Sequence, residues 1–120
     1  MSVTGFEELI RLVSGLPPVP VAVAGAADSR VLASLREGHE LGFIGRCFVT
    51  GPGDAVARAI EESGDDPSLY EVIPAADDRE MSALAVGAVR ERGAGILVKG
   101  SVKSEAYIKA ILHPEHGIRA

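Results

Sequence analysis

Four short apolar runs, each followed by a longer segment with helical periodicity, constrain the fold of this chain more than any other feature. The first run, residues 19–24, is continuous and mostly apolar, as expected for a strand that is buried on both faces. Residues 47–50, 70–73 and 96–98 repeat the pattern, although Glu71 weakens the third run. Strands that alternate with helical crossovers of roughly a dozen residues pair in parallel. The order predicts an α/β fold with three layers, in which helices cover both faces of a doubly wound, mostly parallel sheet.

Five helices are predicted from capping residues and from apolar side chains at helical spacing. The first, over residues 4–13, begins after Thr4 and has an apolar face made of Phe6, Leu9, Ile10 and Val13. The second helix is expected to begin at Asp28 or Ser29 and to end at Gly42, and the third to begin at Asp54. The fourth is expected to begin at Asp77 and Asp78 and to end at Gly93, and the fifth to end before Pro114. The last helix carries Tyr107, Ile108, Ile111 and Leu112.

Size and composition restrict the class of protein. At 120 residues the chain has room for one such domain and not for two, so residues 1–120 are predicted to form a single α/β domain. Aromatic residues are only 4% of the chain, which leaves the core to Val, Ile, Leu and Ala. With 12 basic and 17 acidic side chains the net charge is −5, and this argues against nucleic acid or an anionic membrane as the partner.

The sequence lacks an apolar stretch long enough to span a membrane and has no second cysteine, and these two features bear on the expected location and on disulfide formation. The apolar stretch over residues 19–27 is far shorter than the roughly 20 residues that span a membrane. Cys47 is the only cysteine, so no disulfide can form within the chain, and a reducing cytoplasm is the expected location.

Ligands of open parallel sheets bind at the carboxyl ends of the strands, and one of the predicted loops there differs from the others. Three loops carry an acidic residue at the helix start, where capping is the simplest role, and Gly25 and Gly51 begin two of these crevice loops. The fourth is basic and rich in hydroxyls, which predicts a pocket for an oxyanion or phosphate formed by Lys99, Gly100, Ser101, Lys103, Ser104 and Lys109. The alternative is ordinary surface, with Ser104 as a helix cap and Glu105 reducing the positive charge.

Signals for a protein nucleophile or a metal are weak. Cys47 lies within a predicted strand, where a cysteine is usually a small buried hydrophobe, and no His or Lys is expected near it. Asp65 and Asp66 are expected in a solvated loop. His113 and His116 have a spacing that suits a metal on a helix, but Pro114 interrupts that helix, so no metal site is expected.

Several segments resemble a known family in order and spacing. They are VAVAGAAD at 21–28, AGILVKG at 94–100 followed by Val102, IKAIL at 108–112, and GIR at 117–119. Together they resemble the amino-terminal portion of the phosphate acetyltransferases and phosphate butyryltransferases, the phosphotransacylases, and are most similar to the butyryltransferase branch. The resemblance implies only part of the full family fold.

Function, substrates and site residues follow from the resemblance as expectations. The family moves an acyl group between coenzyme A and inorganic phosphate, so coenzyme A is a substrate, no cofactor is needed, and the coenzyme's thiolate is the nucleophile. Lys99, Gly100 and Ser104 would line the phosphate or acyl side of the cleft, and Lys109 stands where relatives often have Arg. Lys103 departs from the family's run of small hydroxyl residues.

The resemblance also leaves roles open. The family's catalytic residues belong to the later part of its sequence, so no catalytic residue is assigned here. Activity is expected to need a missing segment or a complementing partner chain, and exposed sheet edges favour a homo-oligomer. The alternative is a non-catalytic module that binds coenzyme A or phosphate, or that regulates another protein.

Overall fold

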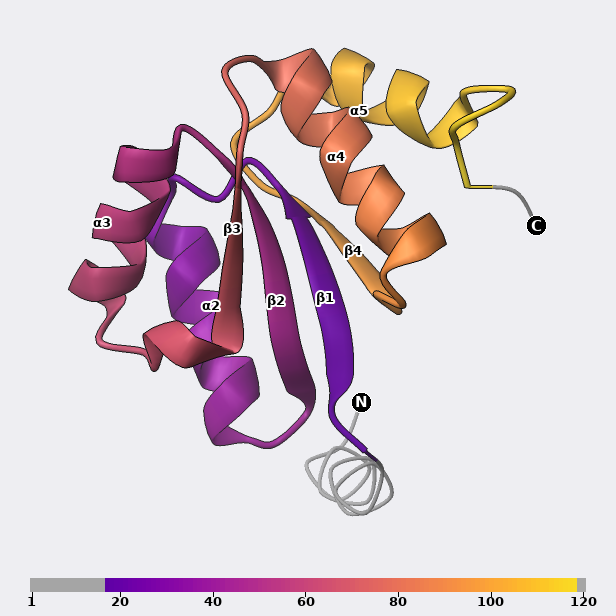
Figure 1. Cartoon of the computed structure of the whole chain (residues 1–120). Helices are drawn as coiled ribbons and strands as arrows, with labels where there is room; N and C mark the ends of the chain where they lie inside the picture. The colour runs from indigo at the N-terminus through magenta and orange to yellow at the C-terminus, as the bar shows by residue number, and fades with distance from the viewer. Residues whose placement is uncertain (1–16, 119–120) are drawn as a thin grey trace, which may run out of the picture.

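A computed structural model describes residues 17–118 and shows a four-stranded sheet between two pairs of helices (Figure 1). The elements, in chain order, are β1 (Val19–Ala24), α2 (Ser29–Glu40), β2 (Ile44–Gly51), α3 (Gly53–Ser63), a 3₁₀ turn η1 (Pro67–Leu69), β3 (Tyr70–Pro74), α4 (Asp78–Glu91), β4 (Ile96–Lys99) and α5 (Ser104–Leu112). The helix predicted over residues 4–13 lies outside the described residues.

The sheet order is β3-β2-β1-β4 and every pairing is parallel. Helices α2 and α3 cover one face, and α4 and α5 lie on the other (Figure 1). Because the chain moves from β1 to β3 on one face and then crosses to β4 on the other, the sheet is doubly wound. The predicted fold class is confirmed, with a sheet that is wholly parallel.

Each face of the sheet has its own apolar core, because successive side chains of a strand point to opposite faces. Val21 and Val23 of β1 pack with α2 and α3, in a cluster that includes Leu35 and Ile60. The alternate positions of β1 are alanines, and the small Ala22 and Ala24 meet a second cluster. Its other buried members include Phe48, Met81, Ala85, Ala88 and Val102.

Most predicted strands and caps are confirmed. Asp28 accepts a hydrogen bond from the N–H of Arg30 at the start of α2, and Asp77 accepts one from Glu80 at the start of α4. Strand β2 begins at Ile44, three residues before the predicted start, and Gly45 and Arg46 interrupt the apolar pattern. The register with β1 also shifts there, since Val19 pairs with Ile44 and Val21 with Cys47.

Two local predictions are wrong. Asp54 does not cap α3: the helix begins at Gly53 behind Pro52, without a side-chain cap, and Asp54 lies in its first turn. The run 96–98 is not a strand buried on both faces, because β4 is one of the two edge strands of the described sheet and Ile96 is 39% exposed.

Within residues 17–118, every helix is too short or too polar to cross a lipid bilayer.

Candidate functional site

The loops at the carboxyl ends of β1 and β4 meet at the point where the sheet changes its winding direction. The helix that follows β1 lies on one face, and the helix that follows β4 lies on the other (Figure 1). In open parallel sheets this divergence opens the crevice in which ligands bind. Gly25, which opens the first loop with a φ of +85°, therefore lies at the expected position for a site.

Direct backbone contacts join these two loops. The N–H of Gly100 donates to the carbonyl of Ala24, and the N–H of Ser101 donates to the carbonyl of Gly25, each at 2.9 Å. The hydroxyl of Ser101 adds a bond of 3.2 Å to the same Gly25 carbonyl. A Cβ at Gly100 would overlap the Gly25 oxygen, so the contact requires glycine. The floor of the crevice is thus closed by main chain.

A buried hydroxyl fixes the neighbouring loop. The side chain of Thr50 accepts the N–H of Gly25 at 3.2 Å, and its oxygen lies 2.8 Å from the carbonyl of Val23 and 3.1 Å from that of Met81. Gly51 follows, with a φ of +151° that favours glycine, and its carbonyl accepts the N–H of Ala75. Both predicted crevice glycines, Gly25 and Gly51, are therefore positioned by main-chain bonds between adjacent loops.

The basic loop leads into α5 with a mixed electrostatic character. Lys103 occupies the capping position, Ser104 is the first helical residue, and neither side chain makes a capping bond. The N–H of Lys103 donates to the carboxylate of Asp78 at 2.9 Å, which places one negative charge beside the loop. The side chains of Lys99, Lys103 and Ser104 belong to exposed residues. Lys103 and Ser104 lie at the amino-terminal turn of α5, whose amides favour anions, and Lys99 is the last residue of β4.

Lys109, the last of the predicted site residues, is paired with a residue of its own helix. Its Nζ lies 2.9 Å from Glu105 one turn earlier, and both side chains are well exposed. The hydrogen bond and charge of Lys109 lower the pKa of the Glu105 carboxyl. Lys109 therefore reaches the loop only by exchanging this partner.

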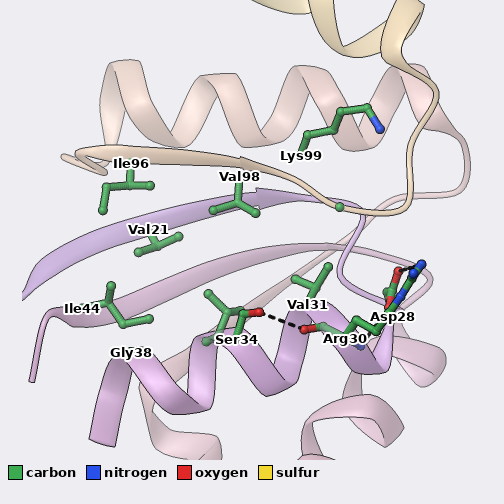
Figure 2. A pocket seen from close by; sticks show the side chains of 12 residues that line it. Val21, Asp28, Arg30, Val31, Ser34, Gly38, Ile44, Ile96, Val98 and Lys99 are labelled. Carbon is green, nitrogen blue, oxygen red and sulfur yellow. Dashed lines mark hydrogen bonds and ion pairs between the residues drawn. The ribbon is translucent and has the colours of Figure 1, made fainter. Parts of the chain in front are cut away.

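Lys99 and the apolar residues of β4 point to opposite faces of the sheet. Lys99 pairs with Ala24 and shares the α4 face, whereas Ile96 and Val98 pair with Val21 and Val23 and share the α2 face. Figure 2 shows the Lys99 side chain directed away from α2, and Ile96 and Val98 bordering a pocket on the α2 side. That pocket has a volume of about 540 Å³.

A second polar cluster lies at the opposite end of the sheet and was not predicted. Asp65 was expected in solvent, but its side chain is only 8% exposed and accepts two hydrogen bonds of 2.6 Å, from Tyr70 and from Nδ1 of His39. The other ring nitrogen of His39 lies 2.8 Å from the carbonyl of Gly45. The two ring nitrogens of His39 thus face two oxygen atoms, one of the Asp65 carboxylate and one of the Gly45 main chain.

This cluster also corrects the description of Cys47. Nε2 of His39 lies 3.6 Å from its sulfur, so a histidine is near the thiol after all. Burial, followed by the negative charge of Asp65, raises the pKa of Cys47 to about 12. A fully buried thiol with this pKa is not a nucleophile, and the expected role as a small core residue stands.

The histidines near the end of the described chain cap a turn. Nδ1 of His113 accepts the N–H groups of Glu115 and His116 at 3.1 and 3.0 Å. The two rings stack with their centroids 4.8 Å apart. Within residues 17–118, no group of three or more His, Cys, Asp or Glu side chains is arranged to hold a metal ion.

Comparison with known proteins connects the chain to acyltransferases. No protein-family model matches it. It is 29% identical to a phosphate butyryltransferase of Clostridium beijerinckii over 95% of its own length and 37% of that protein. A second phosphate butyryltransferase, of Clostridium acetobutylicum, is 26% identical over 98% of the chain and 38% of the relative. A phosphate acetyltransferase of Rickettsia felis is 25% identical over 95% of the chain and 32% of the relative.

A solved structure has a similar fold. The crystal structure of a branched-chain phosphotransacylase from Enterococcus faecalis matches with a TM-score of 0.63 at 21% identity, over 82% of the chain and 33% of that structure. The chain thus spans about a third of the length of the relatives it matches, from 32% to 38%. The chain is thus similar to phosphate butyryltransferases and phosphate acetyltransferases over nearly all of its own length and over part of theirs.

Proposed function

We propose that the chain supplies the amino-terminal part of a phosphate acyltransferase, which moves an acyl group between coenzyme A and inorganic phosphate. In one direction a phosphate oxygen attacks the thioester carbonyl of acyl-CoA, the carbon–sulfur bond breaks, and acyl phosphate and the free thiol of coenzyme A form. The observation that carries the proposal is similarity to phosphate butyryl- and acetyltransferases over nearly the whole chain.

The basic loop is the proposed contact for an anionic group of the substrates. Lys99 at the end of β4 and Lys103 at the start of α5 provide exposed positive charges, and Gly100, Ser101 and Ser104 complete the loop. Phosphate and the phosphates of coenzyme A suit such donors. Asp78 and Glu105 reduce the local positive potential, so we expect weak binding by this part alone and Lys109 to contribute only after it leaves Glu105.

The proposed reaction needs more than these residues, because the chain matches only 37–38% of the length of the two butyryltransferases. We propose that the rest of the site comes from further sequence in the same polypeptide or from a complementing chain, with self-association through the open edge of β4 as the oligomeric contact. A single domain over residues 1–120, a cytoplasmic location and coenzyme A as a substrate are parts of the same proposal.

Titration calorimetry with coenzyme A and with phosphate, at low and moderate salt, tests the anion loop. We expect Lys99→Ala to weaken binding about tenfold, because a hydrogen bond to a charged group contributes about 1.5 kcal/mol or more. Arg90→Ala is the matched control, since Arg90 is an exposed cation on α4 away from the loop. Equal effects of the two variants would show that the loop is ordinary surface.

A chimera tests the reaction. The chain is fused to the part of the C. beijerinckii phosphate butyryltransferase that lies beyond the matched region, and release of coenzyme A from butyryl-CoA is followed with phosphate present. Phosphate-dependent release supports the proposal. A folded chimera that binds coenzyme A without releasing it from butyryl-CoA would instead favour the non-catalytic binding module.

A further inference from the structure

One fully buried hydroxyl connects three segments at the carboxyl end of the sheet. Thr50, near the end of β2, is 0% exposed, and its hydroxyl accepts the N–H of Gly25 at 3.2 Å. The hydroxyl oxygen also lies 2.8 Å from the carbonyl of Val23 and 3.1 Å from that of Met81 in α4. A hydroxyl has one hydrogen to donate, so it donates to one of these carbonyls at a time while it holds Gly25.

Gly25 carries this contact to the basic loop. Its carbonyl accepts both the N–H of Ser101, at 2.9 Å, and the hydroxyl of Ser101, at 3.2 Å. A Cβ on Gly25 would lie 2.9 Å from the main chain of Ser101, so the two loops pack with no room for a side chain between them. The φ of Gly25, +85°, is one that other residues rarely adopt. A change in the orientation of Gly25 therefore displaces Ser101 as well.

The sheet register places Thr50 and Lys99 at one level. Val23 pairs with Val49 and Ala24 pairs with Lys99. Thr50, Ala24 and Lys99 thus follow one another across β2, β1 and β4. Adjacent strands lie about 4.8 Å apart, which separates the main chains of Thr50 and Lys99 by about 10 Å. At this distance Thr50 reaches the basic loop through Gly25 and not directly.

We propose that Thr50 is a positioning residue of the basic loop: its buried hydroxyl sets the orientation of Gly25, which in turn sets the place of Ser101. The inference rests on the anion-binding function proposed for this loop. The amides of Gly100 and Ser101 both donate to carbonyls of β1 and its loop, so a ligand is left with the side chains of the basic loop and the first turn of α5. Where these groups lie depends on the main chain that Thr50 holds.

Two substitutions separate the hydroxyl of Thr50 from its methyl group. Thr50→Val keeps the shape but has no polar atom, and it leaves the amide of Gly25 without this partner. Thr50→Ser keeps the hydroxyl and removes a buried methyl group, which lowers stability without releasing Gly25. Ile60→Val is the matched control, because it removes a buried methyl group from α3, on the other face of the sheet. A positioning role predicts that the loop responds to the hydroxyl and not to stability.

Native-state hydrogen exchange at Gly100 and Ser101 tests the positioning without a ligand. We expect Thr50→Val to accelerate exchange of both amides about fivefold, because the loss of one hydrogen bond shifts a local opening equilibrium by about that factor. Thr50→Ser and Ile60→Val should leave both amides within about twofold of the native rate. Equal acceleration in Thr50→Val and Ile60→Val would overturn the proposal. Fivefold acceleration in Thr50→Ser would do the same, and this variant keeps the test decisive where the valine variant does not fold.

Titration with inorganic phosphate and with coenzyme A tests whether this position matters for binding. We expect Thr50→Val to raise the Kd at least about threefold, because binding then also has to order the loop, and Thr50→Ser to restore the native value. Accelerated exchange with unchanged affinity would overturn the proposal, since Thr50 would then hold the loop without serving the site. A native chain that binds neither probe would instead overturn the function proposed for the basic loop, and the exchange rates would still decide whether Thr50 holds it.

Discussion

Replacing Asp65 with asparagine removes the negative charge at the centre of the buried cluster while keeping the shape of the side chain. In the native protein this carboxylate accepts hydrogen bonds of 2.6 Å from both His39 and Tyr70. These bonds join the end of α2, the loop after α3 and the start of β3. Among the described residues, no other buried side-chain hydrogen bond joins these three segments. The variant therefore tests whether the cluster stabilises the amino end of the sheet.

The size of the loss follows from the contacts. A hydrogen bond to a charged group contributes about 1.5–3 kcal/mol, and the Asp65 carboxylate makes two such bonds, with His39 and Tyr70. Asparagine retains one acceptor, so we expect a loss of about 3 kcal/mol at pH 7. With a urea slope of about 1.5 kcal/mol per molar, the midpoint of unfolding falls by about 2 M.

The pH dependence gives an independent check with a definite sign. Burial raises the pKa of the Asp65 carboxyl, but the hydrogen bonds from Tyr70 and His39 outweigh it and bring the pKa below its ordinary value of 3.8. A carboxylate whose pKa is lowered by folding stabilises the protein above the pKa of the unfolded chain. That stability disappears as the pH falls through the folded-state pKa. The difference between native protein and variant should therefore be full above about pH 5 and shrink below about pH 4.

Urea unfolding followed by circular dichroism at pH 7, 5, 4 and 3 measures both effects. Glu62→Gln is the control, because Glu62 is exposed on α3, and we expect it to change stability by less than about 0.5 kcal/mol. Tyr70→Phe should lie between the two, at about 1–2 kcal/mol, since it removes one bond and leaves the charge. An Asp65→Asn loss no larger than that of the control, or a loss that persists unchanged at pH 3, would refute the reasoning.

Two further predictions concern the core and the crevice. The rise in the pKa of Cys47 from 9.0 to about 12 lowers its thiolate fraction about a thousandfold at pH 8, so a thiol reagent should label the native protein slowly and the urea-unfolded chain rapidly. Rapid native labelling would contradict the burial. Gly100→Ala should destabilise the protein by more than about 2 kcal/mol, because the new methyl group overlaps the Gly25 carbonyl, and Gly87→Ala, in open space on α4, should stabilise it by about 0.5–1 kcal/mol. Thermal unfolding of the two variants shows whether the signs differ.

Local signals in the sequence account for the parts of the fold that were predicted. The continuous apolar run of β1 identifies a strand buried on both faces. Asp28 and Asp77 precede helices, and each accepts a hydrogen bond from an amide in the first turn of its helix. Asp54 also precedes an apolar pattern with helical spacing, yet α3 begins one residue earlier, at Gly53. Pro52 occupies the capping position instead of Asp54. Capping residues thus predict a helix start to within a residue or two.

Features that depend on distant contacts were not predictable from pattern. The apolar run of β4 is identical in kind to that of a central strand, and only the order of the sheet makes it an edge. His39 and Asp65 are separated by 26 positions, with nothing in the intervening sequence to indicate that they meet. In the candidate site, composition identified the basic loop, but the contact of Ser101 with Gly25 joins positions 76 apart.

The sheet order has a consequence for how the chain folds as it leaves the ribosome. Val21 pairs with Cys47, and Cys47 with Tyr70, over separations of about 25 positions each, whereas Val21 pairs with Ile96 over about 75 positions. The first three strands can therefore assemble while the later sequence is still being synthesised, and for that interval β1 is itself an unprotected edge. A nascent chain arrested after β3 should bind holdase chaperones through that edge and release them once β4 has emerged.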